Sequence, residues 1–307
     1  MKIINSLENL MIDEKTVVAL GNFDGIHAGH KVILEDAFNV AIEEGIKALC
    51  FTFSNHPYNF ILNKDENDPD ALKLICSESD KIKMIEKMGF DYLINIPFDE
   101  KIMNMPAQSF FDDILLRKLN AQTISVGFNY TYGVNAEGNA ETLYLSGKDA
   151  GIDVRVHDAV KIFHNVVSST LIRETLAEGN IESVSMYLDR EYSITDHVSD
   201  GMKKGHTIGY PTINFPTSKN ILYPKNGVYA SHTVIDGKEY KSITNIGVKP
   251  TMGGADKTIE THILEFEGEL YGKKVKVVFE HFIRDEEKFS SIEELSNQIS
   301  NDIKKII

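Results

Sequence analysis

The segment from Thr16 to Leu34 constrains this chain more than any other stretch. It reads TVVALGNFDGIHAGHKVIL, in which an apolar run ends in a glycine-containing turn before a helical pattern begins. This order predicts a buried strand, a turn and a helix. His27 and His30 stand at the turn, three residues apart, with Gly29 between them. Because residues three apart share a helix face, we expect both imidazoles to lie together on the first helical turn.

This junction has the properties of a phosphate-binding site. The first turn of a helix carries free backbone N–H groups and the positive end of the helix dipole. Gly29 leaves room for a ligand to approach the backbone. The combination suits a triphosphate. One histidine in such a common unit would indicate little, whereas two histidines flanking a glycine are far more specific.

Composition narrows the class of protein. The 307 residues are 42% hydrophobic and 25% charged, which predicts a soluble chain of two domains. A formal net charge of −14 argues against a general nucleic-acid surface, which needs many exposed Lys and Arg. We find no signal-peptide core and no apolar run of about 18 residues. We therefore expect a cytoplasmic protein that acts on small molecules and binds neither nucleic acid nor membrane. Self-association is compatible with the sequence.

The first half alternates strand and helix patterns. We expect strands at 17–20, 48–53, 91–96 and 121–126, and helices at 31–44, 79–88 and 106–119. His56 and Pro57 are expected in a loop after the second strand. This order predicts a doubly wound parallel sheet. Ligands bind such sheets beyond the carboxyl ends of the strands, where the two histidines are placed.

The pattern changes after about residue 187. Short strands are expected at 229–234, 241–246, 258–266 and 274–282, separated by turn signals such as Asp236-Gly237. They predict a small antiparallel β-barrel. A final helix at 291–306 carries an apolar stripe that we expect to pack into the core. We therefore predict an N-terminal domain of residues 1–187 and a C-terminal domain of residues 188–307.

Two further segments extend the first candidate site. Residues 127–133 read GFNYTYG after the fourth strand, and residues 167–173 read VSSTLIR. The hydroxyls of the second segment can cap a helix. Arg173 can hold a phosphate with its fork of donors, or it can form a surface ion pair with Glu174 or Glu178.

The second half contains its own candidate site. Residues 200–214 read DGMKKGHTIGYPTIN, in which the glycines let backbone N–H groups turn toward phosphates, although an ordinary hairpin would look similar. Thr212 and Asn214 alternate with Ile213, so on a strand they share one face and present oxygen ligands that suit Mg²⁺. Glu260 can accept a proton, or it is an exposed strand residue.

Together these motifs resemble the bacterial bifunctional riboflavin kinase/FAD synthetase family over nearly the whole chain. HxGH at 27–30 and SSTxIR at 168–173 are similar to nucleotidyltransferase motifs, and the glycine-rich stretch with PTxN at 211–214 resembles a flavokinase flap. The resemblance implies phosphorylation of riboflavin to FMN in the second domain. It implies adenylyl transfer from ATP to FMN in the first, giving FAD and pyrophosphate. It also implies ATP as co-substrate and Mg²⁺ as cofactor.

The resemblance further implies roles for individual residues. The implied catalytic residues are His27, His30 and Arg173 in the first domain and Glu260 in the second. The implied ATP- or flavin-binding residues are Gly21, Asn22, Phe23, Asp24, Gly29, Asn129, Ser168, Ser169, Thr170, Gly201, Lys204, Gly205, Gly209, Pro211, Asn245 and Arg284. Thr212 and Asn214 are the implied Mg²⁺ ligands.

Three positions depart from the family pattern. Asn129 stands where many relatives carry Asp, residues 134–137 lack a basic residue, and His206 replaces the usual Arg of the flap. Three alternatives follow. One activity alone can be significant, the chain can be a flavin-binding sensor with degenerate sites, or it can adenylylate another phosphate compound. Adenylylation of another phosphate compound would not account for the predicted C-terminal barrel, which carries the PTIN sequence at residues 211–214.

Overall fold

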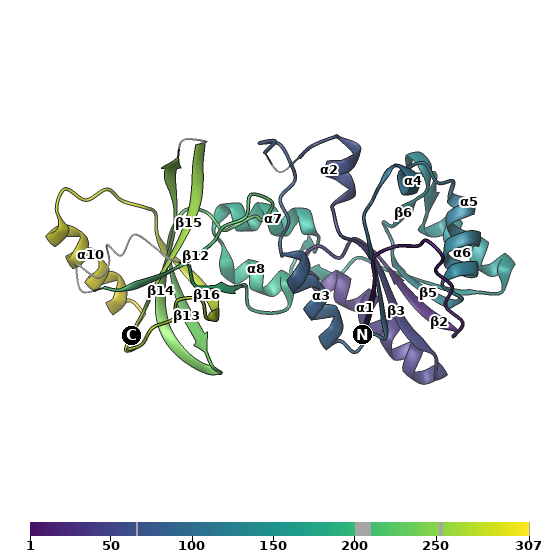
Figure 1. Cartoon of the computed structure of the whole chain (residues 1–307), viewed down its shortest axis with the longest axis horizontal. Coiled ribbons are helices and arrows are strands. Elements are labelled where there is room, and N and C mark those ends of the chain that lie inside the picture. Colours follow the sequence, from purple (N-terminus) through teal and green to yellow (C-terminus); the bar gives the residue numbers. More distant parts are fainter. Residues whose placement is uncertain (66, 200–209, 252–253, 307) are drawn as a thin grey trace. The chain divides into compact units, whose positions relative to one another are not determined.

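Contacts divide the chain into a first unit, Met1–Ser169, and a second unit, Thr170–Ile307. The structure is a computed structural model, which describes residues 1–65, 67–199, 210–251 and 254–306 (Figure 1). The predicted domain boundary between residues 187 and 188 stays a prediction.

The first unit is built on a six-stranded parallel sheet. Its strands run in the order β1 (Lys2–Ile4), β4 (Tyr92–Ile96), β3 (Lys47–Phe53), β2 (Thr16–Leu20), β5 (Ala121–Gly127) and β8 (Asp153–His157). All neighbouring pairs are parallel. The predicted parallel sheet is confirmed, and the two edge strands β1 and β8 are additions to it.

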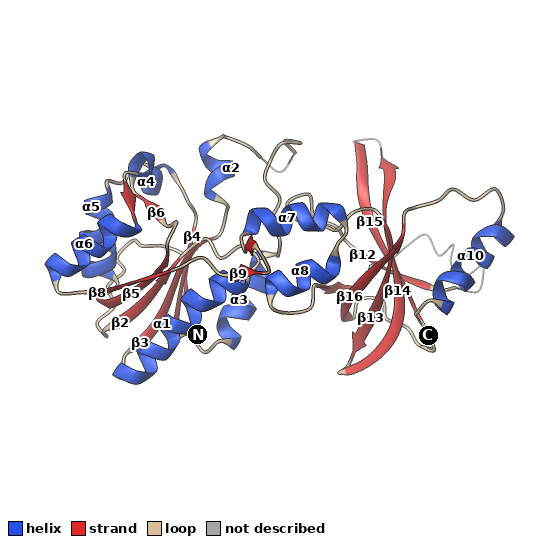
Figure 2. Ribbon diagram, turned by 180° about the vertical axis from the view of Figure 1, so that it is seen from behind, coloured by secondary structure: helices blue, strands red, loops and turns tan. Residues whose placement is uncertain are grey.

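Helices cover both faces of this sheet (Figure 2). Val17 and Ala19 of β2 pack with α1 (Ala28–Glu44) and α3 (Glu78–Lys87) in one buried cluster. Val18 and Leu20 point the other way and pack with the π-helix η1 (Phe110–Lys118) and with α6 (Ala140–Ala150). This alternation follows from the two-residue period of a strand. The sheet that contains β2 is therefore the middle layer, with a layer of helices on each face.

The predicted helices form, with local differences. Gly45 ends α1 in the left-handed conformation at φ 67°, as its position predicts. The helix predicted at 106–119 is a short α5 (Ala107–Ser109) continued by η1. The loop prediction for Pro57 is wrong: the residue begins α2 (Pro57–Ile61), and the His56 side chain caps it by accepting a hydrogen bond from the Tyr58 N–H. Proline at the first helical position suits such a start.

Short elements complete the first unit. They are α4 (Glu100–Met103), β6 (Thr131–Tyr132), η2 (Val134–Ala136), β7 (Gly138–Asn139), β9 (Lys161–Ile162) and β10 (Asn165–Val166). Helix α7 (Ser169–Glu178) crosses into the second unit and is followed by α8 (Ile181–Leu188).

A polar cluster ties edge strand β8 to α1. Asp36 of α1 accepts three hydrogen bonds from the Arg155 guanidinium, two from Nε at 2.8 and 3.1 Å and one from Nη2 at 2.8 Å. It also lies 3.1 Å from His157 Nε2. Ser125 of β5 contacts the same His157 nitrogen at 2.8 Å. Burial alone would raise the pKa of Asp36, but Arg155 and His157 outweigh it and hold that pKa below its ordinary value.

We predict that Asp36→Asn destabilises the first unit at neutral pH. The loss of charged hydrogen bonds should lower the free energy of unfolding by about 1–2 kcal/mol. Because the folded-state pKa is depressed, this contribution exists above the ordinary value of about 4 and disappears as the pH falls through the folded value. Urea unfolding at neutral and acidic pH tests this, with the exposed neighbour Glu35→Gln as control. Equal midpoints for Asp36→Asn and wild type at pH 7 would contradict it.

The second unit is an antiparallel sheet. Its order is β11 (Ser193–His197), β16 (Lys274–Arg284), β13 (Gly227–Ile235), β14 (Lys238–Thr251), β15 (Gly254–Ile263) and β12 (Thr212–Phe215). Every adjacent pair is antiparallel. Just beyond β11, the Ser199 N–H donates to the Asn214 carbonyl of β12 at 2.9 Å, which joins the two edges. The predicted antiparallel barrel is thereby confirmed.

The terminal helix α10 (Ile292–Lys304) is held by a buried ion pair. Asp302 is 1% exposed and accepts a 2.9 Å hydrogen bond from Arg284 Nε of β16. Gln298 donates to the other carboxylate oxygen at 2.9 Å. The expectation that the apolar stripe packs into the core is wrong for Ile292, which is 67% exposed. Asp302 is the residue of this helix that is buried, so the helix is anchored through this charged contact.

Candidate active sites

The two histidines of the HxGH motif stack on each other at the start of α1. Their ring centroids are 3.6 Å apart with an interplanar angle of 16°. His27 is the N-cap, and its Nδ1 accepts a hydrogen bond from the His30 N–H at 3.2 Å. The predicted pairing is confirmed, but His27 lies one residue before the helix rather than on its first turn. Both rings therefore lie at the positive end of the helix.

His30 carries a buried nitrogen without a partner. Among the described residues, its Nδ1 has no hydrogen-bond partner. Phe23 packs edge-on against the ring, with centroids 5.3 Å apart. Burial, followed by the charges of His27 and Lys81, holds the pKa of His30 well below its usual value. At neutral pH the imidazole is therefore uncharged, and its free nitrogen can bind a ligand group.

The turn after β2 brings two predicted segments together. Asp24 is buried, and its Oδ1 accepts a hydrogen bond from the Ile75 N–H at 2.9 Å. Its carbonyl accepts a 3.1 Å hydrogen bond from Ser169 Oγ, which places the SST motif against the GNFDG turn. A Cβ on Gly29 would lie 3.3 Å from the His27 ring, so a larger residue would crowd the histidine pair.

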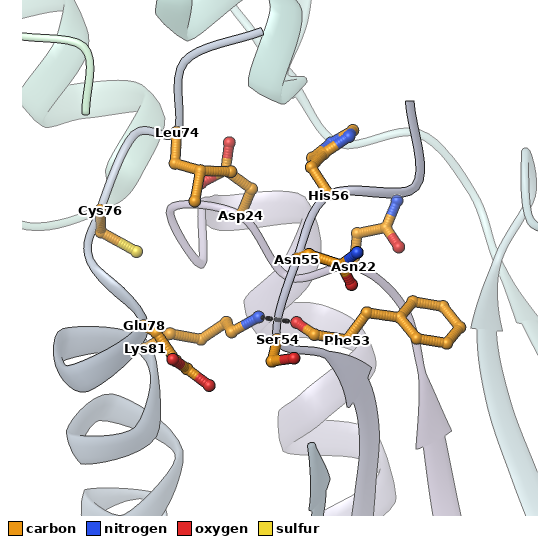
Figure 3. Close-up of a pocket in the computed structure, with 10 residues that line it drawn as sticks. All are labelled: Asn22, Asp24, Phe53, Ser54, Asn55, His56, Leu74, Cys76, Glu78 and Lys81. Carbon is orange, nitrogen blue, oxygen red and sulfur yellow. Dashed lines mark hydrogen bonds between the residues drawn. The ribbon is translucent and has the colours of Figure 1, made fainter. Parts of the chain in front are cut away.

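A cavity opens beyond the carboxyl ends of β2 and β3 (Figure 3). Its lining residues are Asn22, Asp24, Phe53, Ser54, Asn55, His56, Leu74, Cys76, Glu78 and Lys81. Parallel sheets bind ligands at this edge. The cavity includes Asn22 and Asp24 of the predicted site, but neither His27 nor His30 lines it.

Lys81 is the functional candidate that the sequence analysis missed. It is only 8% exposed, and its Nζ donates to the Phe53 carbonyl at 2.6 Å (Figure 3). The missed signal is its position four residues before Ile85, which puts a lysine on the buried face of α3. Lysine is rarely buried without a reason.

Other predicted residues of the first site are not all brought together. Asn129 is exposed in the loop that follows β5. Thr170 and Arg173 lie on α7 beyond the division between the units. Their participation, like that of Ser168, stays a prediction.

In the second unit, strand register gathers three predicted residues. Glu260 of β15 lies opposite Asn214 of β12 on one side and opposite Asn245 of β14 on the other. Directly opposed residues of antiparallel strands share a face. Glu260 is half-buried within this row. Thr212 lies in the adjacent row on the same face, because it is two residues from Asn214.

His262 is a second residue that the sequence analysis did not assign. It lies opposite Thr212, and its Nδ1 is 2.8 Å from the Pro211 carbonyl. Because a carbonyl only accepts, Nδ1 carries the proton and Nε2 is left as an acceptor. The signal was the two-residue period, which puts His262 on the face of Glu260.

Other residues predicted for this second site are either outside the described part of the chain or engaged in a different contact. Gly201, Lys204, Gly205 and Gly209, with His206, lie outside the described residues. Arg284 forms the ion pair with Asp302 that anchors α10, and a role in ligand binding stays a prediction for it. Across the described part of the chain, we find no helix that is both long and apolar enough to cross a membrane.

Comparisons with known proteins match both units. The family model described as FAD synthetase matches residues 10–171, and the model described as riboflavin kinase matches residues 188–307. The chain is 34% identical over 298 residues to the bifunctional riboflavin kinase/FMN adenylyltransferase of Bacillus subtilis, covering 95% of this chain and 92% of the relative. It is 30% identical over 305 residues to the protein of the same name from Escherichia coli, covering 98% and 96%.

A solved structure has the same fold over almost the whole length. The crystal structure of a protein named macrolide-efflux protein from Streptococcus pneumoniae matches with a TM-score of 0.89 and 27% identity, covering 99% of this chain and 97% of that chain. With a family model for each of two enzymes and relatives of at least 30% identity along nearly its entire length, the chain belongs to the bifunctional riboflavin kinase/FMN adenylyltransferase family.

Proposed function

We propose that each of the two sites performs one reaction of the family: riboflavin kinase in the second unit and FMN adenylyltransferase in the first. The observation that most supports the first assignment is the stacked pair of His27 and His30 at the start of α1. The row formed by Asn214, Glu260 and Asn245 supports the second.

In the first unit, the phosphate of FMN attacks the α-phosphorus of ATP and pyrophosphate leaves. The attacking oxygen is already anionic, so the protein needs no nucleophile of its own. Catalysis then rests on positioning and on stabilising charge on the phosphates. His27, His30 and the N-terminus of α1 supply donors and a positive dipole end. Arg173 stays a predicted phosphate ligand.

In the second unit, Glu260 accepts the proton of the riboflavin 5′-hydroxyl as that oxygen attacks the γ-phosphorus of ATP, and ADP leaves. A carboxylate among two amides suits this role, because the amides orient substrate while only the carboxylate takes the proton.

Mg²⁺ fits the donors present in the second unit. Thr212 offers a hydroxyl oxygen and Asn214 an amide oxygen on one face, which are hard ligands of the kind Mg²⁺ prefers. When bound, the ion neutralises negative charge on the phosphates. The described residues contain no cluster of three or more acidic, histidine or cysteine side chains that could hold a metal.

We also infer that the protein works in the cytoplasm on small molecules and not on nucleic acid or membranes. The net charge of −14 argues against a general nucleic-acid surface. A domain boundary near residue 187 agrees with the start of the riboflavin kinase model at residue 188.

A product time course tests the proposal. Purified protein receives riboflavin, ATP and Mg²⁺, and a parallel reaction starts from FMN. We expect FMN to appear first and FAD later from riboflavin, and FAD directly from FMN. FAD from FMN alone would contradict the kinase assignment, and FMN alone would contradict the adenylyltransferase assignment. Bound flavin with no product in either reaction would instead indicate a sensor.

A further inference from the structure

His262 lies in the second candidate site and has no part in the chemistry proposed above. It follows Glu260 by two residues on β15, so both side chains are on the same face of the sheet. Its Nδ1 lies 2.8 Å from the Pro211 carbonyl oxygen. Because that oxygen can only accept, Nδ1 carries the proton and donates it. The ring of a β15 residue therefore holds the residue that precedes β12.

The Pro211 carbonyl is well placed to fix the start of β12. Proline has no backbone N–H, so its carbonyl is the only main-chain group that it can offer to a neighbour. Among the described strands, the four-residue β12 pairs along its length with β15 alone. Its other edge is tied at Asn214, whose carbonyl accepts from the Ser199 N–H at 2.9 Å. Strand ends with few partners open locally, and His262 ties the end at which Thr212 lies.

The His262 ring is itself held in place. It meets the Tyr210 ring edge to face, with centroids 5.3 Å apart and an interplanar angle of 83°. It is half-buried and lies directly opposite Thr212 in the strand register. A side chain that is locked by packing and by a hydrogen bond can hold a neighbouring functional group in a fixed geometry.

We propose that His262 is a positioning residue for riboflavin phosphorylation, because its Nδ1–H fixes the Pro211 carbonyl. The start of β12 then keeps Thr212 and Asn214 on the face of Glu260. This inference rests on the function proposed above for the second unit. His262 acts through the backbone of β12 and not by touching substrate. Partners that orient a metal ligand commonly change metal affinity or activity by about 10–100-fold, and Thr212 is one of the two residues suited to Mg²⁺.

The test compares two amides in place of His262. The side-chain nitrogen of asparagine lies where Nδ1 lies along the side chain, whereas that of glutamine lies where Nε2 does. His262→Asn therefore keeps a donor for the Pro211 carbonyl, and His262→Gln moves the donor away from it. His197→Gln, at an exposed histidine of β11, is the matched control. FAD formation from supplied FMN and urea unfolding report whether each variant is folded.

NMR measures the contact itself without turnover. Protein labelled with carbon-13 at the proline carbonyl and with nitrogen-15 at threonine gives correlations only from Pro-Thr peptide bonds, which are those at 211–212, 216–217 and 250–251. The signal of Pro211 is the one that disappears in Thr212→Ser. We expect its carbonyl shift to be preserved in His262→Asn and to move upfield in His262→Gln, because the carbonyl loses its hydrogen bond.

The kinase reaction should respond on the side of the nucleotide. We expect kcat/KM for MgATP to fall about tenfold or more in His262→Gln. The KM for riboflavin should stay unchanged, because Thr212 and Asn214 act on the phosphates and not on the flavin. His262→Asn and His197→Gln should stay within about threefold of the wild type. If His262→Gln does not fold, His262→Ala takes its place.

Equal kinase rates in the two amide variants, whether high or low, would overturn the inference. Activity kept by glutamine and lost by asparagine would also overturn it, since that result would place Nε2 against substrate. An unchanged Pro211 shift in His262→Gln would show that the contact does not exist in solution. The NMR measurement needs no product. A wild-type protein that makes no FMN would therefore refute the proposed kinase function without deciding the link between His262 and Pro211.

Discussion

The His30→Ala variant should lose FMN adenylylation by about 10²–10³-fold in kcat and keep riboflavin kinase activity. The reason is local: His30 contributes the buried Nδ1 that has no hydrogen-bond partner among the described residues, next to the start of α1. Removing it deletes a fixed donor or acceptor where charge builds on the phosphates. The measurement is the initial rate of FAD formation from supplied FMN, alongside FMN formation from riboflavin.

A matched control separates this effect from a general disturbance. His164→Ala changes an exposed histidine of the same unit, outside the proposed site, and should leave both rates unchanged. If His30→Ala formed FAD within about threefold of the wild-type rate, the histidine pair would not be part of the catalytic site. Loss of both activities together would indicate misfolding, which urea unfolding would reveal.

Glu260→Gln should give the reverse result. The amide keeps the shape of the side chain but cannot accept the hydroxyl proton, so riboflavin phosphorylation should fall by about 10²–10⁴-fold. FAD formation from supplied FMN should persist. The substitution is mild for the fold, because Glu260 is half-buried between Asn214 and Asn245, which tolerate an amide neighbour.

Glu267→Gln is the control for this prediction, since Glu267 is exposed in the turn after β15. It should retain both activities. A Glu260→Gln variant with a wild-type kinase rate would show that Glu260 is not the base, and the adjacent His262 would then be the residue to test.

Mixing the His30→Ala and Glu260→Gln proteins should restore FAD synthesis from riboflavin, provided that FMN can leave one protein and enter the other.

The sequence by itself determined the central strands of both sheets, but not the edge strands β1 and β8 or the helix α2. The apolar run at 17–20, the turn at 21–25 and the helical pattern after it are local, so the strand, turn and helix of the HxGH segment formed where they were predicted. The same holds for the face shared by Thr212 and Asn214, which follows from the two-residue period of a strand.

Only the tertiary structure decided which side chains meet. The row of Asn214, Glu260 and Asn245 depends on the register of three strands, which no local pattern specifies. The burial of Lys81 depends on α3 packing against the end of β3, and the contact of Arg284 with Asp302 joins residues 18 apart in sequence. Periodicity and turn chemistry act over a few residues, whereas register, burial and charge pairing are set by the packing of whole elements.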